Sequence, residues 1–143
     1  MIRGPILFAV AGCVFTAAAA RIVNADVEWL LRTVPDDTFY YLQIARNLAA
    51  HGQSTFDGSA ATNGYHPLWM FLLTAVATIV DDRVALLRSA MALALALHVC
   101  SSVVVYAIVT RLVDREWGFV AAACWLINPL TFVISAQATE ASV

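Results

Sequence analysis

Residues 84–113 read VALLRSAMALALALHVCSSVVVYAIVTRLV, the longest apolar segment of the sequence. Thirty residues in an α-helix extend about 45 Å, more than the ~30 Å hydrocarbon core of a bilayer. The segment is interrupted chiefly by Arg88, His98 and the pair Ser101-Ser102. We expect a tilted membrane-spanning helix in which His98 and the serines bond neighbouring helices or a carbonyl.

The composition extends this prediction to the whole chain. Hydrophobic residues occupy 62% of the 143 positions and charged residues 13%, a balance that would leave large apolar patches on a soluble domain. All eight basic residues are singly spaced arginines and the formal net charge is −2, so the clustered basic surface that nucleic acid requires is missing. We therefore predict an all-α integral membrane protein in contact with membrane lipid, with no nucleic-acid partner.

Two further apolar segments, residues 6–23 and 117–136, are long enough to span a membrane. Asn128-Pro129 falls inside the second segment and predicts a kink. The first segment has an alternative interpretation as a signal peptide, and residues 10–13 resemble a lipoprotein processing box. The chain stays apolar long after Cys13, which favours an uncleaved span.

Residues 24–83 form a polar, acidic first loop between the first two spans. Within this loop, the spacing of apolar residues from Asp37 to Ala50 predicts an amphipathic helix at the membrane surface, which ends at His51-Gly52. Turn-forming residues over 53–65 predict an irregular loop. The tyrosines of the loop and Trp69 are residue types typical of an interfacial aromatic belt.

The apolar run from His66 to Val80 leaves two topologies open. It covers about 15 residues, a length more typical of a re-entrant or interfacial helix than of a span. In the re-entrant arrangement the chain has three spans, and Glu140 leaves the membrane on the same side as Asp36. In the alternative with four spans, Glu140 and Asp36 lie on opposite sides. Segment length favours three spans.

The acidic pair Asp36-Asp37 at the start of the amphipathic helix is the strongest candidate for chemistry. A purely structural role is available, because acidic side chains at a helix N-terminus cap free N–H groups and complement the dipole. Adjacent residues on a helix point roughly 100° apart, so the two carboxylates do not share one proton or one metal. One can cap the helix while the other projects into solvent.

Three quoted strings carry a resemblance to a known family: PDDTFYYL at 35–42, ARNL at 45–48 and TNGYHPLW at 62–69, followed by Asn128-Pro129 and Thr139-Glu140. Their order between apolar segments resembles the first external loop of the GT-C membrane glycosyltransferases, in particular the protein mannosyltransferase and aminoarabinose transferase branch. The resemblance implies that residues 1–143 are a single N-terminal membrane module of a longer enzyme, inactive alone. It also favours the re-entrant topology.

This family resemblance implies transfer of a sugar from a polyprenyl-phosphate donor to an acceptor outside the cytoplasm, in the cell membrane, with the Asp36-Asp37 loop on the extracytoplasmic side. Asp36 aligns with the catalytic acidic position and is expected to be the general base, with Asp37 as second choice. Arg88 and His66 are expected to bind substrate. A divalent metal, Mg or Mn, is expected at Asp37 and Glu140.

Two other classes of function remain open at the level of sequence. The acidic loop could belong to a non-catalytic membrane module that binds a partner protein or a cation. A transporter fragment is a third interpretation, but it requires ionisable groups facing a cavity inside the membrane, and only His98 qualifies. The sugar and the acceptor are not determined by these residues.

Overall fold

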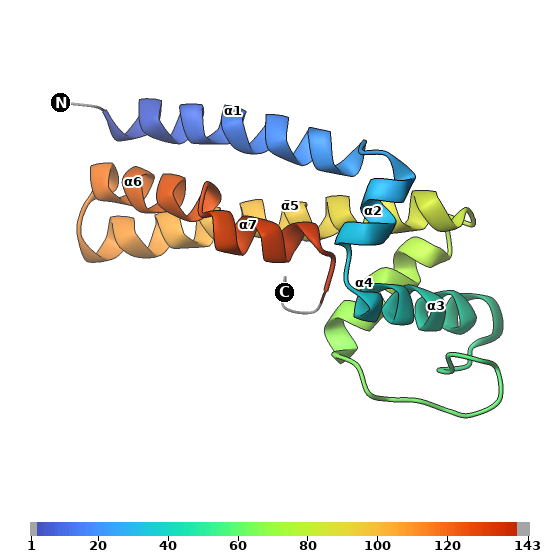
Figure 1. The fold of residues 1–143 in the computed structure, drawn as a ribbon. Helices are drawn as coiled ribbons and strands as arrows, with labels where there is room; N and C mark the ends of the chain where they lie inside the picture. The colour runs from blue at the N-terminus through green and yellow to red at the C-terminus, as the bar shows by residue number, and fades with distance from the viewer. Residues whose placement is uncertain (1–2, 140–143) are drawn as a thin grey trace.

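The computed structural model describes residues 3–139, and these form an all-helical protein (Figure 1). Over this range the structure has no β-strand, only an isolated bridge between Thr55 and Ala61. The helices are α1 (Gly4–Val23), α2 (Val27–Thr33), α3 (Asp36–His51), α4 (Pro67–Ala77), α5 (Arg83–Leu112), α6 (Arg115–Leu126) and α7 (Pro129–Ala136).

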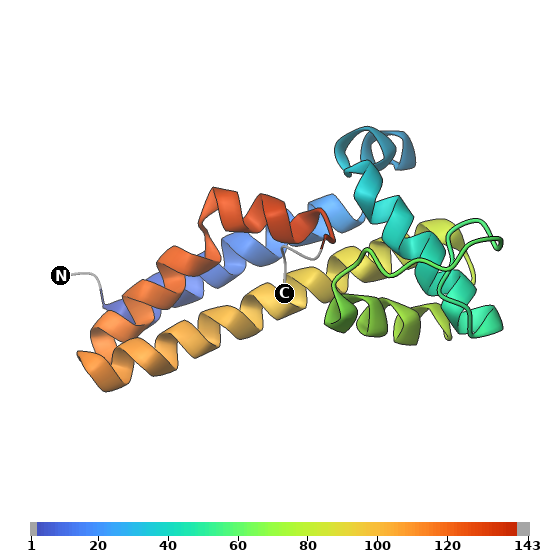
Figure 2. The same ribbon diagram turned by 90° about the horizontal axis from the view of Figure 1, so that it is seen from below.

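The long helices lie side by side as an elongated bundle, with α2, α3 and α4 gathered at one end of it (Figures 1 and 2). Helices α1 and α5 are each long and apolar enough to cross a membrane, and the pair α6 and α7 is a third candidate if it counts as one bent span. These properties indicate a membrane protein. The predicted segments 6–23, 84–113 and 117–136 are thus found as helices.

The third span is broken where the proline predicted a kink. Helices α6 and α7 meet at an angle of 53°. Pro129 supplies no N–H, and the Asn128 side chain accepts hydrogen bonds from the backbone N–H groups of Leu130 and Thr131, at 3.0 and 3.3 Å. These two N–H groups would otherwise serve the carbonyls of Leu126 and Ile127, so the break leaves those carbonyls without helical donors.

His98 of α5 faces this break and is itself buried. Its Nε2 lies 3.4 Å from the Leu126 carbonyl oxygen, and its Nδ1 lies 3.3 Å from Ser135 Oγ. A carbonyl only accepts, so Nε2 carries the proton and Nδ1 accepts from the serine hydroxyl. The ring is stacked between Phe15, with centroids 5.5 Å apart, and Trp125, at 6.0 Å. The prediction that His98 bonds a carbonyl is confirmed.

At the end of the bundle where α2, α3 and α4 gather, these helices and the first half of α5 enclose one apolar core. Trp69 of α4 and Ile44 of α3 have no exposed surface, and Tyr41 is 5% exposed. The interpretation of Trp69 and Tyr41 as interfacial belt residues is therefore wrong: both belong to this core. The sequence alone does not reveal that α4 packs against α3. For this reason Trp69 and Tyr41 were expected at the membrane–water interface.

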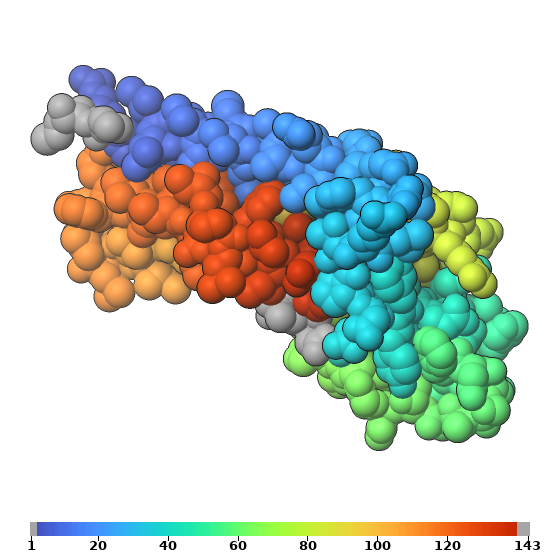
Figure 3. Space-filling model, viewed as in Figure 1, coloured from blue at the N-terminus to red at the C-terminus, as the bar shows by residue number. Residues whose placement is uncertain are grey.

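Two long-range hydrogen bonds join the end of α7 to this core. The Thr38 hydroxyl donates to the carbonyl of Gln137 at 2.8 Å, and the Trp69 indole N–H donates to the carbonyl of Ala138 at 3.1 Å. The space-filling view shows α7 directly against α2 and the start of α3 (Figure 3). The chain after the third span therefore returns to the end of the bundle that carries Asp36.

The first loop contains one helix that was not predicted. Residues 27–33, expected only to be part of the polar loop 24–83, form the short helix α2. The amphipathic helix was predicted at 37–50 and spans 36–51 as α3. Helix α4 has 11 residues, about 16 Å of helix, and is too short to cross the hydrocarbon core. Residues 3–139 thus provide no fourth spanning helix, in agreement with the favoured three-span arrangement.

This arrangement makes a topology prediction. Cysteines placed at Asn63 and at Thr139, in a variant without the natural cysteines, should react with a membrane-impermeant maleimide from the same side of the membrane. A cysteine at Val113, in the turn between α5 and α6, should react only from the other side. Reaction of positions 63 and 139 from opposite sides would contradict the three-span arrangement.

The crossing of α5 and α6 depends on a glycine at position 118. A Cβ atom there would lie 2.2 Å from Thr110 Oγ1 and 3.1 Å from the Tyr106 carbonyl oxygen. Small residues permit such close approach of helices in membrane proteins. By contrast, a Cβ at Gly12 in α1 would meet no atom within 4 Å.

We predict that Gly118→Ala lowers the free energy of unfolding by about 1–3 kcal/mol, because the helices must separate or Thr110 must leave its position. Gly12→Ala is the matched control and should be neutral or stabilise by about 0.5–1 kcal/mol through the higher helix propensity of alanine. Unfolding in mixed detergent micelles by titration with dodecyl sulfate measures both. Equal effects of the two substitutions would show that the crossing does not need glycine.

Candidate functional site

The acidic pair occupies the first turn of α3, and both side chains are exposed. Pro35 is the N-cap residue and offers no side-chain cap. Asp36 Oδ1 accepts a hydrogen bond from the backbone N–H of Asp37 at 3.0 Å. Within residues 3–139, the carboxylate of Asp37 has no hydrogen-bond partner. Asp36 therefore satisfies one free N–H of the helix and keeps Oδ2 available, while Asp37 projects freely.

Beside the two carboxylates lies an open hollow of about 520 Å³. Its walls combine acidic, aromatic and amide side chains, which come from α3 and from the following loop: Asp36, Asp37, Phe39, Tyr40, Gln43 and Phe56. The aromatic faces provide apolar surface against which a ring of similar size can pack. Aromatic rings and carboxylates together can bind a polyhydroxylated ring. A carboxylate then faces a hydroxyl group of that ring or of a second molecule beside it.

The aromatic wall is built by contacts between α3 and the loop of residues 52–66. The Tyr40 and Phe56 rings stack with centroids 4.9 Å apart and planes 17° from parallel. The Tyr40 hydroxyl lies 2.9 Å from Thr62 Oγ1. Asn47 Nδ2 donates to the carbonyls of Thr55 and Phe56, at 2.7 and 3.1 Å. The loop has no regular secondary structure, as predicted, but it is held closely against the helix.

Asp57 organises the tip of this loop. Its carboxylate accepts from the backbone N–H and hydroxyl of Ser59, at 2.9 and 2.7 Å, and from the Ala60 N–H at 3.3 Å. The Ser59 backbone N–H, followed by the Ser59 hydroxyl and the Ala60 N–H, lowers the pKa of Asp57 from 3.8 to about 2. These are the contacts of an Asx turn, in which the side chain fixes the backbone that follows it.

His66 and Arg88 lie apart from the residues that line the acidic hollow. His66 is exposed at the N-cap of α4, and its side chain makes no capping bond; its backbone N–H donates to the Tyr41 hydroxyl at 3.2 Å. Arg88 is half-buried in α5 and donates through Nη2 to the Ala25 carbonyl at 3.1 Å. Its buried Nε has no hydrogen-bond partner in the part of the chain that the structure describes.

The metal prediction concerns Asp37 and Glu140, and Glu140 lies outside the described residues. Among residues 3–139 there is no group of three or more His, Cys, Asp or Glu side chains placed to hold a metal ion. Asp37 supplies one exposed carboxylate, a ligand type that Mg²⁺ or Mn²⁺ accepts.

The sequence indicated the two acids but not the walls of the hollow. Asp36, Tyr40 and Gln43 recur at i, i+4 and i+7, a spacing that places them on one face of α3 and could have indicated a binding surface. Phe56 carried no such signal, because its position depends on how the loop folds back.

Comparisons with family models, with curated proteins and with solved structures find no match for this chain.

The Asp57 turn predicts a pH-dependent loop. Because the folded pKa is depressed, the turn is stabilised above the unfolded value near 3.8, and this stabilisation is lost as the pH falls through about 2. We expect lower hydrogen-exchange protection of the Ser59 and Ala60 amides near pH 2 than near pH 5, after correction for intrinsic rates. Asp57→Ala should remove the protection at both pH values, whereas Asp26→Ala, in an exposed acid outside residues 52–66, should not. Unchanged protection in Asp57→Ala would show that the turn does not need its carboxylate.

Proposed function

We propose that this chain is the N-terminal part of a membrane glycosyltransferase that moves a sugar from a polyprenyl-phosphate donor to an extracytoplasmic acceptor. The observation that carries the proposal is the placement of two exposed carboxylates beside an open hollow with aromatic walls. The resemblance of residues 35–69 and of the later Asn128-Pro129 and Thr139-Glu140 steps to GT-C enzymes supports the same function. The hollow then faces the extracytoplasmic side of the cell membrane.

In the proposed reaction an acceptor hydroxyl attacks the anomeric carbon of the donor sugar. The bond from that carbon to the phosphate oxygen breaks, its electron pair leaves with the phosphate, and the configuration inverts. The transition state resembles an oxocarbenium ion. Asp36 takes the proton of the attacking hydroxyl on Oδ2, since Oδ1 already accepts the Asp37 N–H. Asp37 is the second candidate for this role.

The departing phosphate needs positive charge, which the proposal assigns to Arg88, with His66 as a further substrate contact. Arg88 suits this role because its guanidinium is held at one nitrogen by Ala25 while its buried Nε is unpartnered within the described residues. A Mg or Mn ion on Asp37 and Glu140 would supply additional charge neutralisation when bound.

We predict that Asp36→Asn, made in the longer protein of which this chain is proposed to be a part, lowers the rate of sugar transfer about 10²–10⁴-fold at normal expression. Asparagine keeps the shape and the bond to the Asp37 N–H but cannot accept the proton. Asp26→Asn, in an exposed acid outside the hollow, is the control and should transfer at the normal rate. The measurement is transfer of a radiolabelled sugar from a polyprenyl-phosphate donor.

Normal transfer by Asp36→Asn together with loss in Asp37→Asn would move the base to Asp37. Normal transfer by both variants would reject catalysis in this hollow and favour a non-catalytic membrane module that binds a partner or a cation. The 143-residue chain alone is expected to be inactive, and transfer by it would contradict its assignment as only a part of the enzyme.

A further inference from the structure

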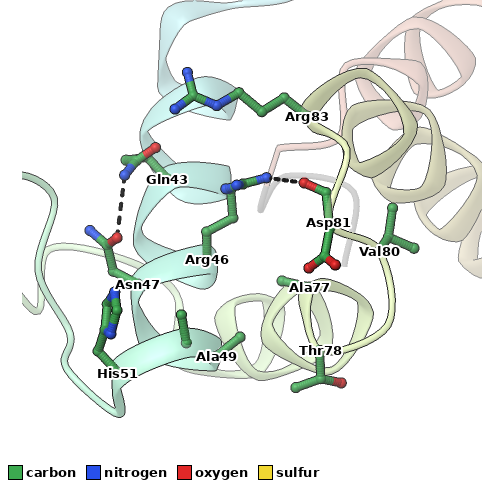
Figure 4. Close-up of a pocket in the computed structure, with 11 residues that line it drawn as sticks. Gln43, Arg46, Asn47, Ala49, His51, Ala77, Thr78, Val80, Asp81 and Arg83 are labelled. Atoms are coloured by element: carbon green, nitrogen blue, oxygen red, sulfur yellow. Dashed lines mark hydrogen bonds between the residues drawn. The ribbon is translucent and has the colours of Figure 1, made fainter.

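A second, polar cavity of about 410 Å³ lies at the opposite end of α3 from the acidic pair (Figure 4). It is enclosed by the last turns of α3, the end of α4 and the start of α5. Figure 4 shows two arginines from different helices, Arg46 of α3 and Arg83 of α5, reaching around it. The proposed transfer reaction does not use this cavity.

The charge in the cavity is predominantly positive. The Arg46 guanidinium is held in place by a hydrogen bond from Nη1 to the Asp81 carbonyl oxygen. Within residues 3–139 no acceptor is bonded to the Arg83 guanidinium, and His51 also lines the cavity. The carboxylate of Asp81 is the single acidic side chain among the lining residues. Two guanidinium groups around one cavity suit a phosphate, which they can bind through paired N–H groups.

An apolar groove of about 280 Å³ continues from this cavity between α2, α3 and the start of α5. Its walls include Leu30, Leu31 and Leu42, and it shares three lining residues, Gln43, Arg46 and Arg83, with the polar cavity. The two spaces therefore meet at the guanidinium groups. A ligand that fills both must carry an anionic group and a hydrocarbon chain.

The composite site lies at the first residue of a candidate membrane span, where a lipid could contact it with both its phosphate and an acyl chain. Arg83 is the first residue of α5, a candidate membrane span, and Asp81 and Asp82 precede it. Two large apolar side chains beside the site are exposed, Ile79 at 84% and Leu31 at 57%. Exposure of such apolar side chains is unfavourable in water and favourable in contact with acyl chains.

We propose that the cavity and the groove together bind an anionic phospholipid, with its phosphate between Arg46 and Arg83 and one acyl chain in the leucine-lined groove. This inference does not rest on the proposed sugar transfer. Neither Arg46 nor Arg83 lines the hollow beside Asp36, and Arg46 follows Asp36 by ten residues, about 15 Å along the axis of α3.

The test is a lipid titration of the full chain in detergent, followed by native mass spectrometry. Wild type should bind dioleoylphosphatidylglycerol about tenfold more tightly than dioleoylphosphatidylcholine, whose phosphate is partnered by its own choline. Arg83→Gln should weaken phosphatidylglycerol binding about tenfold. This variant is the primary one because Arg83 makes no described hydrogen bond, so the fold does not depend on it. Arg46→Gln should have a similar effect, provided that its melting temperature matches wild type.

Arg111→Gln is the matched control, since it removes the same charge from an exposed arginine at the other end of α5 and should bind phosphatidylglycerol as wild type does. Leu31→Asn should weaken both lipids, because it places an amide in the groove. Inorganic phosphate in large excess should displace the lipid only weakly. Displacement at concentrations equal to those of the lipid would instead identify a free-anion site. That result, an unchanged affinity in Arg83→Gln, or equal binding of the two lipids would overturn the proposal.

Discussion

The structure depends on two hydrogen bonds that fasten the chain at the end of α7 to α3 and α4. Thr38 and Trp69 donate to the consecutive carbonyls of Gln137 and Ala138, which follow the last helix. A carbonyl left without a donor in an apolar environment costs several kcal/mol, so the end of α7 has a strong preference for this one position. Because the donors come from α3 and α4, the same two bonds fix how these helices sit on the bundle. The position of the acidic hollow follows from this attachment.

This attachment requires the third span to bend. The break at Asn128-Pro129 turns α7 by 53° and directs its end toward α3, and the cost of the break is reduced by two side chains. Asn128 takes the free N–H groups of the new helix, and His98 approaches the Leu126 carbonyl that those groups left behind. His98 is itself held by aromatic rings on both faces and by Ser135. The contacts of His98 with the Leu126 carbonyl and with Ser135 give this polar residue a structural role beside the broken helix.

The parts of the fold that sequence could predict are those with local causes. The lengths of the apolar segments predicted α1, α5 and the third span, the periodicity of 37–50 predicted α3, and Pro129 predicted the bend. Helix α2 was missed because its seven residues are too few to show a helical period within the polar loop. The burial of Trp69 was missed because it depends on α3 and on residue 138, which are distant in the sequence. The candidate site divides in the same way: the exposure of Asp36 and Asp37 follows from their place in the first turn, whereas Phe56 reaches the hollow only through the fold of the loop.

Helix α3 connects these features because its charges are arranged along its axis as its dipole favours. Acidic side chains lie at the N-terminal end, where the dipole is positive, and Arg46 and His51 lie toward the C-terminal end, where it is negative. The side chains that anchor the helix, including Tyr41, Ile44 and Ala45, are buried on a different face. The polar ligand contacts of α3 therefore do not use these anchoring positions, whereas Leu42 belongs both to the core and to the apolar groove. The arrangement that stabilises the helix also places its carboxylates and Arg46 in different hollows, which have Gln43 as a common lining residue. The proposed proton acceptor and the proposed anion-binding group would therefore act from one helix without forming an ion pair with each other.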